Sequence, residues 1–294
     1  MEFLQPQIVS KLGNLELIAR LVVEGFITGL HKSPYHGFSV EFAEHRPYMP
    51  GDEIRHIDWK IYAKTDRFFI KQFEEETNLK AYLLLDASAS MGYTSHAITK
   101  LRYAAIIAAA LTFLMLRQRD AVGLVTFDQV IRTLLPPRSV PSYLSVILKE
   151  LQNTAAGSST RIAAALHQTA ERLHRRGLII LLSDLLDEPH EILAGLKHFR
   201  HKKHEVIVFH LLDPLEITFD FRQDGFFQDM ESGETLPTQP WHVRSEYRRL
   251  AAQFIEEMKR ECLSHRIDYV TVRTDAPLDR VLLEYLIKRK RIGG

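Results

Sequence analysis

The sequence predicts an α/β fold in which a doubly wound, mostly parallel sheet carries helices on both faces. Continuous apolar runs, each as long as one buried strand, recur along the chain and alternate with segments of helical periodicity. Polar residues directly follow two of these runs, as they do at the carboxyl edge of an open parallel sheet. The predicted strands lie near residues 80–86, 121–127, 178–183, 205–211 and 267–272.

The N-terminal part of the chain predicts a helix followed by a β segment. Apolar residues recur at helical spacing over residues 6–30, and Gly13-Asn14 is a candidate break in that helix. Residues 38–78 are expected to add antiparallel strands outside the main sheet. Within them, the segment 37–63 combines turn, charged and aromatic residues. We expect this segment to belong to the fold, with Trp59 buried.

A strand and a polar loop then open the main domain. The apolar run 81–85 ends in Asp86, and Ser88 and Ser90 follow at alternate positions. One carboxylate and two hydroxyls at a sheet edge make a hard oxygen site, which suits Mg²⁺ with its about six oxygen ligands. The pattern by itself is weak, because Asp and Ser also form turns and helix caps.

The chain returns to the same sheet edge after four further elements. These are an alanine-rich helix over 99–117, a strand over 122–127, its hairpin partner over 130–135 and a short helix over 140–151. A glycine-serine loop then opens a helix at Ile162, with Ser159 or Thr160 as the expected N-cap and Gly177 as its C′ residue. The next buried strand ends in Ser183-Asp184. Two parallel strands therefore end in aspartate at one edge, and the Thr160 loop lies between them in the sequence.

The C-terminal third completes the alternation of strands and helices. It predicts a helix over 189–200, a strand over 205–209, an antiparallel excursion over 215–240, a helix over 242–263, a strand over 268–272 and a last helix over 277–290. We expect residues 1–78, the N-terminal helix and β segment, to pack on a main domain of residues 79–294. That domain would carry a β insertion near 213–240.

Composition limits the classes of function. The chain has 294 residues, 46% of them hydrophobic, and a formal net charge of +1, so bulk electrostatics favours no nucleic-acid partner. The single cysteine, Cys262, excludes an internal disulfide. The longest strongly apolar stretch, residues 103–116, is too short to span a bilayer. We therefore expect a cytoplasmic protein without direct membrane insertion.

The main domain resembles the von Willebrand factor A domain, a Rossmann-type α/β fold, and its metal-ion-dependent adhesion site. The resemblance covers residues from about 79 to 290. Its three metal-binding loops correspond to Asp86-x-Ser88-x-Ser90, Thr160 and Asp184. The resemblance implies that the two serines bind the ion through their hydroxyls, Thr160 directly or through water, and the two aspartates largely through water. It also implies an acidic side chain from a partner as the remaining ligand, and Mg²⁺ as the ion, with Mn²⁺ or Ca²⁺ as alternatives.

The preceding segment is similar to the signature of a bacterial family, domain of unknown function 58. The residues that carry this similarity are Glu44, Arg46, Tyr48, Pro50, Gly51, Asp52, Arg55, Ile57, Asp58 and Trp59. Members of that family join this signature to an A-type domain, and their genes commonly lie beside those of MoxR-type AAA+ ATPases. The resemblance implies an adaptor or co-chaperone that works with such an ATPase.

The leading hypothesis is therefore a metal-dependent protein-interaction module rather than an enzyme. The alternative is a Mg²⁺-dependent phosphohydrolase with Asp86 as nucleophile or ligand. It is disfavoured because metal hydrolysis needs a general base near the ion, and neither aspartate loop contains a histidine. A further possibility is that Arg161 pairs with Asp184, so that the site binds an acidic partner without metal.

Overall fold

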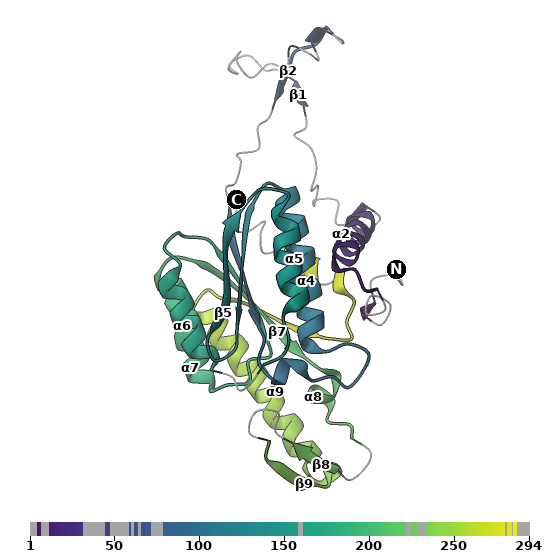
Figure 1. Cartoon of the computed structure of the whole chain (residues 1–294), viewed down its shortest axis with the longest axis vertical. Helices are drawn as coiled ribbons and strands as arrows, with labels where there is room; N and C mark the ends of the chain where they lie inside the picture. Colours follow the sequence, from purple (N-terminus) through teal and green to yellow (C-terminus); the bar gives the residue numbers. More distant parts are fainter. Residues whose placement is uncertain are drawn as a thin grey trace. The chain divides into compact units, whose positions relative to one another are not determined.

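The structure is a computed structural model of the chain. It describes residues 5–6, 12–31, 45–47, 59, 62–63, 66–71, 79–157, 161–221, 225–228, 233–279, 281–283 and 285–286. The chain divides into two compact units, of which the smaller is Ile27–Asn78 and the larger joins Met1–Phe26 to Leu79–Gly294. Both are drawn in Figure 1. The expected packing of residues 1–78 on the main domain stays a prediction.

The smaller unit contains a two-stranded antiparallel sheet. Strand β1 (His45–Pro47) pairs with β2 (Phe69–Lys71), as the predicted antiparallel strands within 38–78 require. The predicted burial of Trp59 is wrong, since this side chain is 56% exposed. Its ring makes a T-shaped contact with that of Tyr62. Most of the 37–63 segment lies outside the described residues.

The larger unit is built on a six-stranded sheet. Its strands are β3 (Lys80–Asp86), β4 (Ala121–Phe127), β5 (Ile131–Arg138), β6 (Leu178–Ser183), β7 (Glu205–Leu212) and β10 (Asp268–Arg273). Their order across the sheet is β10-β7-β6-β3-β4-β5, and every pair is parallel except β4 with β5. Numbered along the chain within this sheet, the order is the 3-2-1-4-5-6 of a doubly wound fold. The predicted fold class is confirmed.

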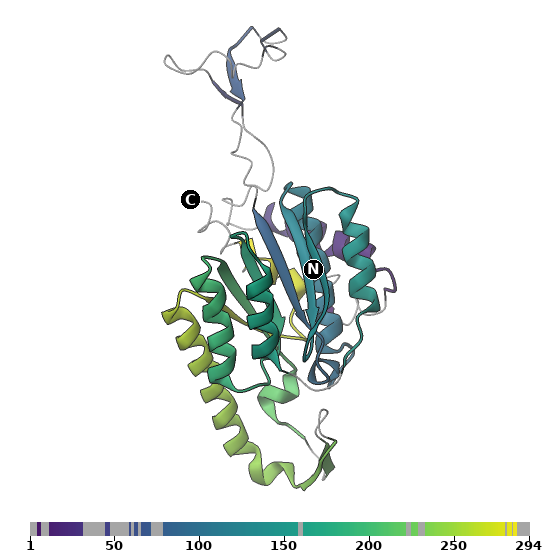
Figure 2. The ribbon, with the colours of Figure 1, turned by 60° about the vertical axis from the view of Figure 1, so that its left-hand side comes forward.

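Helices cover both faces of this sheet (Figures 1 and 2). They are α2 (Leu15–His31), α4 (Lys100–Arg117), α5 (Tyr143–Asn153), α6 (Ile162–Arg172), α7 (Pro189–His201) and α9 (Pro240–Ser264). The break predicted at Gly13-Asn14 corresponds to the start of α2, because the Asn14 side chain accepts hydrogen bonds from the amides of Glu16 and Leu17. After β10, the described residues within 278–286 are helical, as predicted for that stretch.

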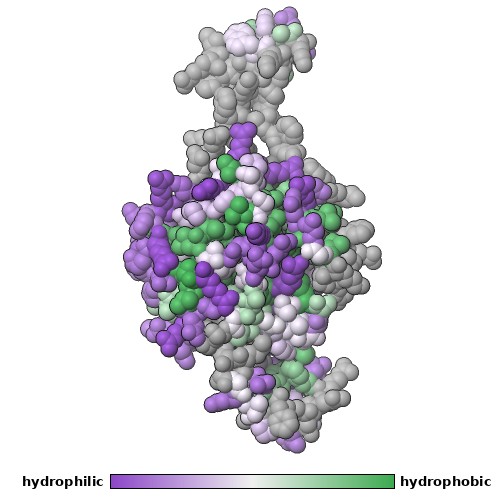
Figure 3. Space-filling view, in the orientation of Figure 1, coloured by the Kyte–Doolittle hydropathy of each residue, from purple (hydrophilic) through white to green (hydrophobic). Residues whose placement is uncertain are grey.

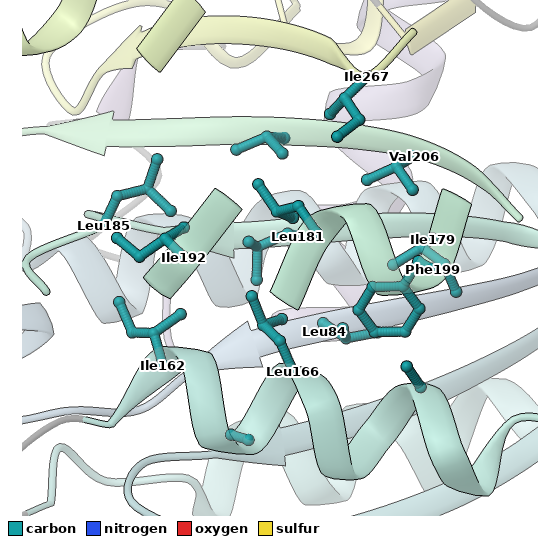
Figure 4. Close-up of a cluster of buried hydrophobic side chains, with 14 of the residues drawn as sticks. Leu84, Ile162, Leu166, Ile179, Leu181, Leu185, Ile192, Phe199, Val206 and Ile267 are labelled. Carbon is teal, nitrogen blue, oxygen red and sulfur yellow. The ribbon is translucent and has the colours of Figure 1, made fainter. Parts of the chain in front are cut away.

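Alternate residues of each strand face one helical layer, which gives the sheet two apolar faces. Figure 4 shows the cluster on the face covered by α6 and α7, where Leu84 and Leu181 of neighbouring strands meet Leu166 and Phe199. All four side chains are fully buried. The opposite face is covered by α4, whose alanines let the helix lie close to β3 and β4. The sheet is therefore fixed from both sides.

Strand β5 forms one edge of the sheet and runs antiparallel to its neighbour. It contains Pro136 and Pro137, which have no amide hydrogen. The adjacent Gly123 of β4 lies so close to β5 that a Cβ atom there would be 2.6 Å from the Leu135 carbonyl oxygen. Only glycine fits this close approach.

Three predicted local features differ in the structure. The N-cap of α6 is Arg161, and not Ser159 or Thr160. Gly177 is not the C′ residue of α6, which ends at Arg172; it stands at the start of β6, where a Cβ would be 2.2 Å from the Lys80 carbonyl oxygen. The excursion after β7 begins with a helix, α8 (Pro214–Thr218), before the antiparallel pair β8 (Gly225–Gln228) and β9 (Thr235–Thr238). The Asp213-Pro214 pair starts α8, because Asp213 caps it and proline suits its first position.

The surface of the larger unit mixes polar and apolar side chains (Figure 3). Helix α9 exposes part of its apolar side chains, among them Trp241 at 44% and Leu250 at 52%. None of the helices in the described part of the chain combines the length and apolar character that crossing a bilayer requires.

Candidate functional site

The candidate site lies where the strand order of the sheet reverses. Strand β3 pairs with β4 on one side and with β6 on the other, and Leu85 stands opposite Leu182 in the β3–β6 register. The residues that follow, Asp86 and Ser183-Asp184, therefore reach the carboxyl edge side by side. This position, between the first and fourth strands in chain order, is where open α/β sheets bind ligands.

Asp86 is the centre of a small buried hydrogen-bond network. The Ser183 hydroxyl donates to its Oδ2 at 2.6 Å, and the Ser88 amide donates to its Oδ1 at 2.9 Å. The Ser88 and Ser90 hydroxyl oxygens are 3.0 Å apart, and both serines are buried. One carboxylate and two hydroxyls are thus brought together by the loop and by the short 3₁₀ turn η3 (Ser90–Gly92).

The charge of Asp86 is poorly compensated. Burial, and then the negative charge of Asp184, raise the pKa of Asp86 to about 7, although the hydrogen bonds from Ser183 and Ser88 act in the opposite direction. Among the residues that the structure describes, no lysine, arginine or histidine pairs with Asp86. A fully buried carboxylate without a cation is costly, so this position favours a bound cation or proton.

Asp184, in contrast, has a cation of its own. The Lys100 ammonium lies 2.7 Å from Asp184 Oδ2 and also contacts Glu216 Oε1. The side chains of Lys100 and Asp184 are fully buried, and that of Glu216 is 19% exposed. Burial acts to lower the pKa of Lys100, but the charges of Asp184 and Glu216 outweigh it and raise this pKa above its ordinary value. Lys100 therefore stays charged.

Glu216 is held in place by the capping of α8. Its Oε2 accepts a hydrogen bond from the Asp213 amide at 2.8 Å, and the Asp213 carboxylate accepts one from the Leu215 amide, also at 2.8 Å. The loop before α4 contacts the same carboxylate, since the Ser95 amide donates to Asp213 Oδ2 at 2.8 Å. Helix α8 thus fixes one carboxylate against Lys100, and the loop at Ser95 fixes α8.

His210 supports Asp184 from the neighbouring strand. Burial lowers the pKa of His210 to about 4, so the ring is neutral at pH 7. Its Nε2 lies 2.9 Å from the Asp184 carbonyl oxygen, which can only accept, so Nε2 carries the hydrogen. Nδ1 then accepts from the Tyr269 hydroxyl. This pair of contacts fixes the backbone at the end of β6.

Comparison with known families identifies the group to which the chain belongs. The model of the family described as "Protein of unknown function DUF58" matches residues 44–257. This chain belongs to the DUF58 family. An uncharacterized protein of Mycobacterium tuberculosis is 26% identical to it over 291 residues, which cover 97% of this chain and 91% of the relative.

Two solved structures are similar to the DUF58 chain. The conserved hypothetical protein BatB from Bacteroides thetaiotaomicron has a TM-score of 0.51 at 19% identity, covering 72% of this chain and 99% of BatB. This likeness supports the fold alone. The SpRpn10 VWA domain, also similar, has a TM-score of 0.38 at 11% identity and covers 69% of this chain and 93% of that domain.

The structure brings together four of the five site residues predicted for this DUF58 chain. Asp86, Ser88 and Ser90 form one network, and Asp184 lies beside Asp86 on the next strand. Thr160 lies outside the described residues. The possibility that Arg161 neutralises Asp184 is wrong, because Arg161 is exposed and the cation on Asp184 is Lys100.

Sequence reasoning missed Lys100, Glu216 and His210. Lys100 had a signal, since a cation in the first turn of a helix opposes the helix dipole and calls for a nearby acid. Glu216 had a weaker one, because it stands three residues after a capping aspartate, as in a capping box. His210 had no such signal, because a histidine within a buried strand is expected to be part of the core.

The donor set of the DUF58 site suits a hard divalent cation. Asp86, Ser88 and Ser90 offer oxygen ligands at one point, and Asp86 has no cation of its own among the described residues. Soft or borderline metals are disfavoured, because these donors are carboxylate and hydroxyl oxygens rather than the thiolates and imidazoles that such metals prefer. The residues present therefore fit Mg²⁺ better than zinc.

Proposed function

We propose that this DUF58 chain is a protein-interaction module that binds an acidic side chain of a partner with the help of a divalent cation. The family and the α/β fold support the coarser part of this statement, an interaction module. The observation that carries the finer part is the buried carboxylate of Asp86, which has no cation among the described residues and lies beside the paired hydroxyls of Ser88 and Ser90.

Each described residue has a definite part in this proposal. Asp86, Ser88 and Ser90 would hold the ion, and Thr160 and Asp184 would complete its ligands directly or through water. Ser183 orients Asp86 through its hydrogen bond, and His210 fixes the backbone of Asp184. When bound, the ion supplies an electrophilic position for the carboxylate of a partner. The site performs no bond chemistry in this proposal.

The proposed partner is a MoxR-type AAA+ ATPase, for which the chain would act as adaptor or co-chaperone. This rests on the family, in which such ATPases are encoded beside the DUF58 gene. The contact is expected to be weak without the ion, because Asp86 and an incoming acid repel each other. A partner with a basic contact surface would contradict the proposal.

The metal part is tested by calorimetry with Mg²⁺ and Mn²⁺ on wild type and Asp86→Ala. Wild type should bind and gain roughly 2.7 kcal/mol of stability at about 100 times the dissociation constant. Asp86→Ala should lose this gain and still fold, because it relieves the repulsion between Asp86 and Asp184. Equal, negligible heats for both proteins would rule the metal out.

Asp275→Ala is the matched control for this experiment. Asp275 also follows a parallel strand, β10, but that strand is the far edge of the sheet, and Arg273 already pairs with Asp275 at 2.7 Å. Its loss should leave ion binding unchanged. The partner is tested with the same three proteins by capture of the AAA+ ATPase in Mg²⁺ and in EDTA. Only Asp86→Ala should behave in Mg²⁺ as wild type does in EDTA.

A further inference from the structure

Lys100 is an unusual residue for the position that it occupies. It is the first residue of α4, where its positive charge opposes the helix dipole, and its side chain is fully buried. Burying a lysine ammonium is costly unless acids surround it. Its acids come from distant parts of the chain, Asp184 after β6 and Glu216 on α8.

The position of Lys100 matters because Lys100 pairs with the carboxylate of Asp184. Asp184 is one of the two aspartates at the sheet edge where the proposed ion would bind, and it lies close enough to Asp86 for their charges to repel. The ammonium at 2.7 Å removes much of the negative potential of Asp184. It also places a positive charge where a divalent ion would experience repulsion.

The ammonium is held there by more than Asp184. Glu216 also pairs with the ammonium. The position of Glu216 is fixed by the capping of α8 and by the contact between Ser95 and Asp213. The ring of Tyr93 also faces the ammonium, with its centroid 5.8 Å from Nζ. A buried ammonium with two carboxylates and a ring around it stays in place when the ion is absent.

We propose that Lys100 is an internal cation of the site that opposes binding of the divalent ion, and that Glu216 on α8 anchors it. This inference rests on the proposed function, because it assumes the ion-binding site at Asp86. Lys100 sets how tightly the ion binds, and it leaves the site neutralised in part when no ion is present. Asp86, which has no such cation in the part of the chain that the structure describes, is the carboxylate left for the ion.

The test compares ion affinity in four proteins by calorimetry with Mg²⁺ and Mn²⁺. The informative variant is Lys100→Met with Glu216→Gln, which removes the ammonium and the charge of its anchor together. Glu216→Gln alone is its matched control, since Lys100 then keeps Asp184. Arg161→Met is the second control, because it removes an exposed cation near the same edge.

The double variant should bind Mg²⁺ at least tenfold more tightly than wild type, and its thermal midpoint should rise more steeply with added Mg²⁺. Glu216→Gln should bind no more tightly than wild type, and Arg161→Met should stay within about threefold of it. Equal, measurable affinities in wild type and the double variant would overturn the role of Lys100 and leave the metal site standing. If no protein binds either ion, the metal site and this inference both fall.

A second variant covers the case in which the first does not fold. Lys100→Gln in the Glu216→Gln background keeps an amide that can donate to Asp184, so less buried polar surface is left without a partner. It should show the same tightening of at least tenfold. An affinity no tighter than that of wild type would overturn the proposal.

Discussion

The larger unit contains two regions that exclude water equally and are stabilised differently. Between the sheet and helices α6 and α7, Leu84, Leu166 and Phe199 are fully buried among apolar neighbours. At the carboxyl edge of the same sheet, Asp86, Lys100 and Asp184 are just as buried. In the first region no side chain needs one particular partner, because burial of apolar surface is non-directional.

In the second region each group depends on a named partner. Lys100 is compensated by two acids, whereas Asp86 accepts hydrogen bonds from Ser183 and Ser88 and has no cation among the described residues. Equal burial therefore does not mean equal robustness, since loss of one charge leaves another buried and unpaired. The difference also shows where a ligand is needed, because of the two aspartates at this edge only Asp184 has a counter-charge among the described residues.

The largest effect is expected when the compensated pair is broken. Lys100→Met alone should destabilise the fold by about 3–5 kcal/mol, because Asp184 and Glu216 are left buried without a cation. Urea unfolding measures it, with the exposed Lys149→Met as the control. A loss below about 1 kcal/mol would show that the charged region is as tolerant as a surface.

The next largest effect is a dependence of stability on pH that arises from His210. The pKa of His210 falls from 6.5 to about 4 in the folded state because the ring is buried. As pH falls below 6.5, His210 binds a proton in the unfolded chain but stays neutral in the folded chain. The wild type therefore loses stability down to about pH 4. Relative to His210→Gln, this loss should reach roughly 3 kcal/mol. Parallel stability curves for the two proteins between pH 7 and 4 would contradict it.

A smaller effect tests how tightly the apolar region is packed. Gly195→Ala on α7 should destabilise by about 1–3 kcal/mol, because the new Cβ would lie 2.9 Å from the Leu166 Cβ. Helix propensity alone predicts the opposite sign, a gain of about 1 kcal/mol. Adding Leu166→Ala should then cost less than it does in wild type, and a double-mutant cycle measures this coupling. Strictly additive losses would show that the core adapts freely.

The smallest effect is expected where an ion pair is exposed. Arg249 and Glu246 pair on the solvent side of α9, with both side chains more than half exposed. Arg249→Ala should leave the denaturation midpoint unchanged, since water and salt screen such pairs. A midpoint shift comparable to that of Lys100→Met would mean that burial does not explain the contrast.

The parts predictable from the sequence follow the same division. Apolar runs such as 81–85 and 178–182 predicted the strands, because a buried strand leaves a continuous apolar run in the sequence. The aspartate that follows each run predicted that the two strands end at one sheet edge, and they are neighbours in the structure. The Asp86 loop was predictable for a similar reason, as a contiguous motif after a strand. Gly177 was misassigned because a close strand approach and a helix end both call for glycine.

The rest depended on contacts between distant positions. Lys100 and Glu216 are 116 residues apart, and the local sequence around either residue does not indicate that the two form a pair. Helix α8 was missed because five residues are too few for a periodic pattern, although Asp213-Pro214 marked its start. Trp59 was expected inside because large aromatic residues usually are, yet it is exposed.

Strand β5 has a consequence for how these molecules associate. An edge strand normally offers a row of free amides to which another chain can add a strand, the first step towards domain swapping and amyloid. Pro136 and Pro137 interrupt that row within β5, because neither has an amide hydrogen to donate to an incoming strand. At this side the sheet is a poor template for growth, which favours recognition through side chains over recognition by strand addition.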